Sequence, residues 1–300
     1  MSCWHGNLPA ECGSLSVYLR LLALTMKVLI PTSSWETAWF TTALIISAYL
    51  FLQPASYGRF HATNRYTLTV PGKAGWFIQE LVSPICFLLS FFSDPEQVQR
   101  QADIKLFSLG TVACICWTLH YFNRVFVYTY RAPHMSPTRI EIVLAAILFN
   151  LVNGTWNGAV ARKYAERSIW EYDKRASLCC GIALFLWGMY VNIISDNELM
   201  RLRRQKVPCQ QGSVTLSNGR KYFIPEENMH RFVSCANYFG EIVEWTGYAL
   251  FMDGETAAVG FWVWTLANLV PRAVQTNKWY RRTFGEKYPK NRKAVIPFVL

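Results

Sequence analysis

The chain has 300 residues, of which 52% are hydrophobic and only 16% are charged. Soluble domains usually contain about 25% charged residues, so this composition excludes an ordinary water-soluble protein and indicates a membrane protein. Aromatic residues at 15% exclude a disordered chain, and the net charge of +11 is compatible with nucleic-acid binding or with basic cytoplasmic loops.

The first 34 residues differ from the rest of the chain. Residues 14–31 are apolar, but Arg20 and Lys27 interrupt them, which makes the segment a poor membrane span. It also has no small-residue cleavage site of the kind that ends a signal peptide. We therefore expect residues 1–34 to form an N-terminal extension that is interfacial or disordered.

Seven better candidates for membrane spans follow, each bounded by charge, proline or glycine. We therefore expect an all-α membrane protein: a seven-transmembrane helical bundle with a cavity inside it, forming one domain over residues 35–300. The predicted spans are residues 37–52, 75–92, 105–128, 140–160, 177–195, 236–252 and 257–270.

The distribution of lysine and arginine predicts the orientation of this bundle. Fifteen of the 30 cations lie in residues 196–235 or after Pro271, and the turn between the last two spans, Asp253 to Glu255, contains none. Cytosolic loops carry an excess of cations, so we expect both basic segments and the C-terminus on the cytosolic side. The connection at residues 161–176 disagrees, because it carries five cations on the opposite side.

Cysteine and histidine do not indicate a metal site or a disulfide framework. The nine cysteines form no paired CxxC motif, and the five histidines form no HxxxH or HExxH motif. We interpret the cysteines in and beside the spans as buried free thiols. We expect no metal and no nucleic acid as a partner.

Polar residues inside the spans indicate function, because ionisable groups are costly in lipid. Glu80 is the acid of an otherwise apolar second span, and a buried carboxyl group there could remain protonated and donate a hydrogen bond. Other polar residues recur on single helical faces. They are Trp117, Tyr121, Arg124 and Tyr128; Asn150, Asn153 and Asn157; Asn192 and Asp196; Asn237, Glu241 and Glu244; and Asn268 and Arg272.

These stripes exceed what helix packing requires, so we expect them to line a polar cavity. Arginine is suited to phosphate, while asparagine and aspartate suit ribose hydroxyls and amides, so a phosphorylated nucleotide cofactor fits this set. The chain contains neither GxGxxG nor GxxxxGK[ST], which excludes a Rossmann fingerprint and a P-loop.

At these motifs the chain resembles the steroid 5α-reductase family, the NADPH-dependent 3-oxo-5α-steroid 4-dehydrogenases. The resemblance covers residues 53–300, and details such as LVNG and SCANYFGE are most similar to plant-type members. The matching stretches are AGWFIQELVSP, LHYFNRVFVY, NLVNG, GMYVNIISDNELMRLR, FVSCANYFGEIVEWTGYAL and NLVPRAVQTNKWYRRTFGEKYPKNRKAVIPFVL.

The resemblance implies reduction of the C4=C5 double bond of a 3-oxo-Δ4 steroid in the endoplasmic reticulum membrane. Glu80 and Tyr121 would hydrogen-bond the C3 carbonyl oxygen, and hydride would then add at C5. Trp76 would line the steroid slot. The partners would be a steroid or another lipid-soluble enone and membrane lipids, and we expect a monomer.

The resemblance also implies the residues that bind NADPH. They are Asn192, Asp196, Arg203, Tyr222, Asn237, Glu241, Arg272 and Tyr280. The chain departs from the family at Thr276, where many members have histidine, and at Ile224 to Asn228, where IPEEN replaces IP-x-GG. Phe223 also stands where some members have arginine.

Three other functions remain open from the sequence. A polyprenol or trans-2-enoyl-CoA reductase would also act on an activated double bond, but the QEL and HYF motifs favour a steroid. The chain could instead be a catalytically silent membrane scaffold, or a methyltransferase that uses S-adenosylmethionine, to which the motifs are less similar.

Overall fold

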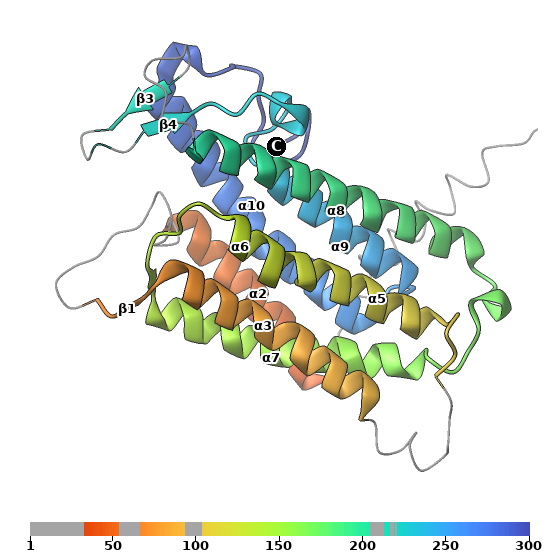
Figure 1. The fold of residues 1–300 in the computed structure, drawn as a ribbon. Coiled ribbons are helices and arrows are strands. Elements are labelled where there is room, and N and C mark those ends of the chain that lie inside the picture. Colours follow the sequence, from red (N-terminus) through yellow and green to blue (C-terminus); the bar gives the residue numbers. More distant parts are fainter. Residues whose placement is uncertain (1–32, 54–66, 94–103, 205–212, 217–218, 220) are drawn as a thin grey trace, which may run out of the picture.

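The computed structural model describes residues 33–53, 67–93, 104–204, 213–216, 219 and 221–300. Long helices dominate this part of the chain (Figure 1). The long helices are α2 (Ser34–Leu52), α3 (Gly72–Phe92), α5 (Leu109–Phe122), α7 (Ile140–Lys163), α8 (Arg175–Arg204), α9 (Ala236–Phe251) and α10 (Thr256–Phe284), and α6 (Thr129–Arg131) is a single short turn. The π-helix η2 (Asn123–Tyr128) joins α5 to α6, so the three form one continuous helical rod.

Each of the seven expected spans coincides with a helix, but several boundaries were wrong. The third helix begins at Leu109 instead of residue 105, because the Ser108 hydroxyl accepts a hydrogen bond from the Thr111 N–H and caps the helix there. Helix α10 continues to Phe284 instead of residue 270, since its second half packs against protein and not lipid.

Within the described ranges, five helices are long and apolar enough to cross a membrane: α2, α3, α7, α8 and α10 with its short extension. Large apolar side chains such as Leu44, Leu89 and Leu148 are more than 60% exposed on their outer faces. Such a surface is stable in contact with lipid. The expected class of a helical membrane protein is therefore confirmed, while the number of seven spans stays a prediction.

Two short antiparallel sheets were not expected. Strand β1 (Thr69–Val70) pairs with β2 (Thr138–Arg139) at the starts of α3 and α7, and β3 (Ser213–Thr215) pairs with β4 (Lys221–Phe223). Strands of two or three residues leave no periodic pattern in a sequence. Short 3-10 helices also occur: η3 (Ile169–Glu171), η4 (Asn228–Arg231) and η5 (Gly285–Lys287).

Glycines bring two pairs of helices into close contact. A Cβ atom at Gly188 of α8 would lie 2.3 Å from the Glu244 nitrogen, and one at Gly240 of α9 would lie 2.4 Å from the Asn192 nitrogen. A Cβ atom at Gly158 of α7 would lie 2.3 Å from the Phe87 oxygen of α3. Small residues permit this approach in membrane proteins, so α8–α9 and α3–α7 form two tight pairs.

The rod of α5, η2 and α6 runs between these two pairs, and α10 packs against α2, α7 and α9 (Figure 1). Aromatic rings fill the centre: Trp117 of α5 contacts Phe87 at 4.8 Å and Trp245 at 5.4 Å, and Trp245 contacts Phe261 at 4.2 Å. This core joins α3, α5, α9 and α10. The polar face of the rod lies outside this aromatic core, in the space between the α3–α7 pair and the α8–α9 pair.

The cations at residues 161–176, which disagreed with the expected orientation, are engaged in local contacts. Lys174 forms an ion pair with Asp253 in the α9–α10 turn, and Arg175 donates to the Trp170 oxygen. The Tyr164 hydroxyl donates to Glu255 at 2.5 Å, and its burial beside this carboxylate raises the pKa of Tyr164. The contacts of Lys174 and Tyr164 tie the loop to the acidic turn.

The N-terminal extension lies outside the described residues, apart from the start of α2. The described cysteines are free thiols, but the expectation that they are buried was only partly right. Cys116 and Cys235 are buried, Cys86 and Cys114 are half-buried, and Cys179 and Cys180 are exposed on the surface of α8.

Candidate active site

Arg124 is the centre of a polar cluster between the two helix pairs. It lies on η2, and its Nε atom is 3.8 Å from Oε2 of Glu80 on α3, while its Nη1 atom is 3.4 Å from Oε2 of Glu241 on α9. All three side chains are about 15% exposed or less. One guanidinium is therefore shared by two buried carboxyl groups from opposite sides of the bundle.

Trp76 contacts both the backbone and the guanidinium of Arg124. The indole Nε1 donates a hydrogen bond to the Arg124 oxygen at 3.3 Å, and the guanidinium lies 4.7 Å from the centre of the Trp76 ring. The ring of Tyr128 is 6.0 Å from the same guanidinium. Cation–π contacts stabilise a buried arginine, so both aromatic residues help to fix its position.

The two expected catalytic residues, Glu80 and Tyr121, lie on neighbouring helices. Gln79 donates to Oε1 of Glu80 at 3.4 Å, and the Gln79 oxygen accepts a hydrogen bond from Asn150 of α7 at 2.7 Å. Tyr121 is buried on α5, one turn before Arg124, and its hydroxyl interacts electrostatically with Glu80. The structure thus brings Glu80, Tyr121 and Arg124 into one cluster.

A chain of side-chain amides joins α8 to α9 next to this cluster. Asn192 donates to the Asn237 oxygen at 2.9 Å, and Asn237 donates to Oδ1 of Asp196 at 3.0 Å. Glu241 is one turn beyond Asn237 on α9 and reaches Arg124. Four of the residues expected to bind a cofactor therefore lie together.

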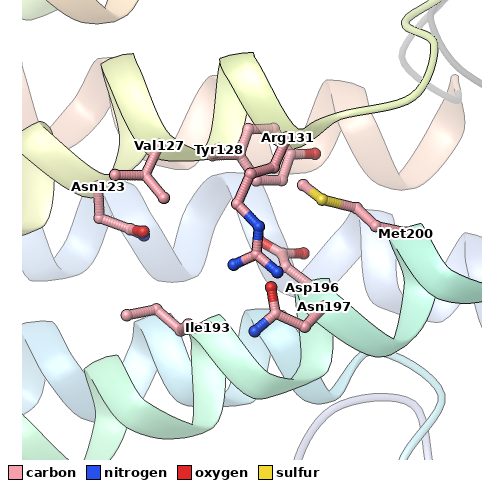
Figure 2. Close-up of a pocket in the computed structure, with 8 residues that line it drawn as sticks. All are labelled: Asn123, Val127, Tyr128, Arg131, Ile193, Asp196, Asn197 and Met200. Carbon is pink, nitrogen blue, oxygen red and sulfur yellow. The ribbon is translucent and has the colours of Figure 1, made fainter.

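A small pocket opens beside Asp196, between the rod and α8 (Figure 2). Its cavity volume is about 10 Å³, far below the ~300–1,000 Å³ of a typical ligand site. The expected cavity for cofactor and substrate together therefore stays a prediction. The lining residues are Asn123, Val127, Tyr128, Arg131, Ile193, Asp196, Asn197 and Met200.

Two arginines lie at this pocket. Figure 2 shows the guanidinium of Arg131 extending toward Asp196 and Asn197. Arg203, which the sequence indicated, is exposed near the end of α8 and hydrogen-bonds the side chain of Tyr128. Arg131 was missed because the predicted span ended at residue 128. Its spacing of three residues from Tyr128 and seven from Arg124 continues the same helical face and could have identified it.

The remaining three expected cofactor residues lie elsewhere on α10 and β4. Arg272 donates to the Tyr238 hydroxyl at 2.8 Å, next to Asn237. Tyr280 is buried and stacks on Tyr288 at 5.3 Å, while Tyr222 packs against Trp279 at 4.9 Å. The last two belong to an aromatic cluster below β3 and β4.

Comparisons with known proteins identify the family of this chain. The family model for 3-oxo-5-alpha-steroid 4-dehydrogenase matches residues 136–300. The steroid 5-alpha-reductase DET2 of Arabidopsis thaliana is 36% identical over 83% of this chain and 88% of its own. The human 3-oxo-5-alpha-steroid 4-dehydrogenase 2 is 35% identical over 86% of this chain and 92% of its own.

The chain belongs to the 3-oxo-5-alpha-steroid 4-dehydrogenase family. The resemblance drawn from the sequence motifs is therefore confirmed, including the similarity to plant-type steroid 5-alpha-reductases. The matched residues of the family model include the α8–α9 amide chain but begin after Glu80 and Tyr121.

The IPEEN segment, Ile224 to Asn228, is fixed by several hydrogen bonds. The N–H groups of Glu226 and Glu227 both donate to Oε1 of Glu198, at 2.7 and 2.8 Å, and Arg292 donates to the Pro225 oxygen at 2.8 Å. Asn228 follows with a φ of 51°, a left-handed conformation that asparagine tolerates. The backbone of the segment therefore contacts both Glu198 of α8 and Arg292 of the C-terminal tail.

His230 lies behind this loop and is fully buried. Its Nε2 atom is 4.0 Å from Oε2 of Glu198, and burial lowers the pKa of His230 to about 4. His230 is therefore neutral at pH 7.

A second buried pair was also missed by the sequence analysis. His120 Nδ1 of α5 lies 2.9 Å from Oε1 of Glu244 on α9. Glu244 belongs to a recognised polar face, but nothing in the sequence indicated His120 as its partner. Among the described residues, no three His, Cys, Asp or Glu are placed to bind a metal ion.

Proposed function

We propose that this protein reduces the C4=C5 double bond of a 3-oxo-Δ4 steroid with NADPH. The observation that carries the proposal is the Arg124 cluster, in which the expected catalytic Glu80 and the expected cofactor residue Glu241 share one guanidinium. Family membership supports the reaction, because the relatives are named steroid 5-alpha-reductases and 3-oxo-5-alpha-steroid 4-dehydrogenases.

Charge counting supports a proton-donating role for Glu80. Arg124 supplies one positive charge to Glu80 and Glu241, and a second uncompensated carboxylate would be costly at this depth. One of the two carboxyl groups can therefore keep its proton. A protonated Glu80 and the Tyr121 hydroxyl would both donate to the C3 carbonyl oxygen of the steroid.

These two donors stabilise charge that develops in the transition state. Hydride addition at C5 moves electrons through the enone to the C3 oxygen, where both hydrogen bonds strengthen. Trp76, one turn before Glu80, would line the steroid slot and hold Arg124 in place. The burial of Tyr121 excludes water from this side of the site.

The residues near Asp196 fit a phosphorylated dinucleotide. Asn192, Asn237 and Asp196 offer amide and carboxylate groups suited to ribose and nicotinamide, and Arg131 and Arg203 offer guanidinium groups suited to phosphate. NADPH would supply the hydride at this position. Arg272, Tyr222 and Tyr280 would complete the site from α10 and β4.

We further propose that the protein spans the endoplasmic reticulum membrane seven times with its C-terminus in the cytosol. The two span candidates beyond the five apolar helices are the α5–η2–α6 rod and α9, which pack between spanning helices. The ion pair between Lys174 and Asp253 is compatible with this orientation, since it neutralises one of the five cations that count against it. Residues 35–300 would form one catalytic domain, acting as a monomer.

Hydride transfer is the direct test. Microsomes containing the protein receive a 3-oxo-Δ4 steroid and NADPH deuterated at the transferred position, and the product is analysed for deuterium at C5. We expect labelled product from the native chain and a loss of about 10²–10⁴-fold in Glu80→Gln and Tyr121→Phe, as for other general acids.

Controls distinguish this function from its alternatives. Tyr248→Phe removes a buried hydroxyl that has no hydrogen-bond partner, so activity should be retained. Turnover of an enoyl thioester but of no steroid would favour the enoyl-CoA reductase. Absence of turnover with every substrate, in a folded protein, would favour a silent scaffold.

A further inference from the structure

The His120–Glu244 pair joins α5 to α9 in the interior of the bundle, and it is one of two buried His–Glu pairs among the described residues. The Glu244 side chain is 0% exposed and that of His120 is 6% exposed. Only one carboxylate oxygen, Oε1, meets the imidazole, and Oε2 has no hydrogen-bond partner. The proposed function uses neither residue.

Burial requires this pair to hold a proton. A lone carboxylate in such a place would carry an uncompensated charge, which is too costly without a partner. Either His120 is an imidazolium beside a carboxylate, or a neutral imidazole lies beside a carboxylic acid. In both forms the pair stores one proton inside the bundle.

The pair lies beside the Arg124 cluster. The His120 ring packs against Tyr121 at 5.0 Å and Trp245 at 4.6 Å, and Glu244 lies one turn after Glu241 on α9. The charged and titratable groups around it are Glu80 of α3, Cys116 and Arg124 of the rod, Glu241 of α9 and, beyond Arg124, Asp196 of α8. His120 is close enough to interact electrostatically with Glu80.

We propose that His120 and Glu244 form the proton store that re-protonates Glu80 in each turnover. This inference rests on the proposed function, because it requires Glu80 as the acid. His120 and Glu244 are then positioning residues that act through Glu80 and do not touch the steroid.

The reaction balances with one hydride and one proton. The hydride forms the C5–H bond, the C4=C5 electrons move to give a C3 enolate, and the Glu80 proton passes to the C3 oxygen. The resulting enol returns to the ketone as C4 takes a proton from water and the C3 hydroxyl releases its proton to water. Glu80 is left as a carboxylate beside Arg124, receives the proton of His120, and the pair regains one from water.

The test compares Glu244→Gln, His120→Gln and the double variant with the native chain in H₂O and D₂O. We expect kcat to fall about 10- to 100-fold with an unchanged KM for the steroid, because the acid still acts but is restored slowly. The solvent isotope effect should rise while the isotope effect of deuterated NADPH falls toward one. The double variant should match the singles, since both remove the same proton.

Two further variants separate a proton store from a structural role. Glu244→Asp keeps a carboxyl group and should recover part of kcat, whereas Tyr248→Phe, one turn later on α9, should leave kcat and both isotope effects unchanged. An unchanged kcat in His120→Gln, or a loss of kcat with an unchanged solvent isotope effect, would overturn the proposal. Such an outcome leaves the steroid reductase intact, whereas no turnover by the native chain would overturn both.

Discussion

Replacement of Arg124 by methionine tests the claim that one guanidinium serves two carboxyl groups. The substitution keeps an unbranched side chain but removes the charge that lies 3.8 Å from Glu80 and 3.4 Å from Glu241. A buried carboxylate left without its partner destabilises a protein by about 3–5 kcal/mol.

The carboxyl group can avoid this cost by taking up a proton. For a glutamate with an ordinary pKa of about 4.3, protonation costs about 3.7 kcal/mol at pH 7 and about 1 kcal/mol at pH 5. The variant binds one more proton than the native chain, so its stability deficit shrinks as the pH falls. With about 2–4 °C per kcal/mol, the melting temperature should fall by about 7–15 °C at pH 7 and by about 2–4 °C at pH 5.

The assay is thermal unfolding of detergent-purified protein at both pH values. Lys174→Met is the matched control, because it removes a partly exposed cation from Asp253 and should cost about 1 kcal/mol or less. Equal shifts of the Arg124→Met variant at pH 5 and pH 7 would refute the shared-charge reasoning.

Three further predictions concern packing, the IPEEN loop and orientation. Gly240→Ala should destabilise the α8–α9 pair by about 1–3 kcal/mol, because its Cβ would meet backbone, whereas Gly260→Ala meets only side chains and should lower the melting temperature less. Glu198→Ala leaves two N–H groups unpaired, so trypsin should cleave after the exposed Arg231 faster than in the native protein; an unchanged rate would contradict the loop's dependence on Glu198. An Asn-x-Thr acceptor inserted after Asp253 should be glycosylated in microsomes, whereas one inserted after Lys287 should not, and the reverse result would invert the proposed orientation.

The helices could be predicted from the sequence because an apolar run of about 20 residues has the length of a helix that crosses the hydrocarbon core of a membrane. The helix ends were less predictable. Helix α5 begins after Ser108 because that side chain caps it, and α10 continues to Phe284, which packs in one cluster with Ile224 and Tyr288. The strands were missed because β1 and β2 each contain two residues.

Most residues of the candidate site could be predicted from the sequence, but their pairings could not. Glu80, Tyr121, Asn192, Asp196, Asn237 and Glu241 were predicted from motifs and helical faces, and the structure places them around Arg124 or the α8–α9 amide chain. His120 could not be predicted as a partner of Glu244, because 124 residues separate them. Helical periodicity identifies a face but not the residue opposite it.

The sequence by itself determined that this is a helical membrane protein of the steroid 5α-reductase family, because composition, apolar length and collinear motifs are properties of the chain. The tertiary structure decided which charges meet: Arg124 between Glu80 and Glu241, His120 with Glu244, and Lys174 with Asp253. These pairings depend on how the α5–η2–α6 rod packs between α3 and α9 and on how the residue 161–176 loop meets the α9–α10 turn, because each pair joins segments that are distant in the sequence.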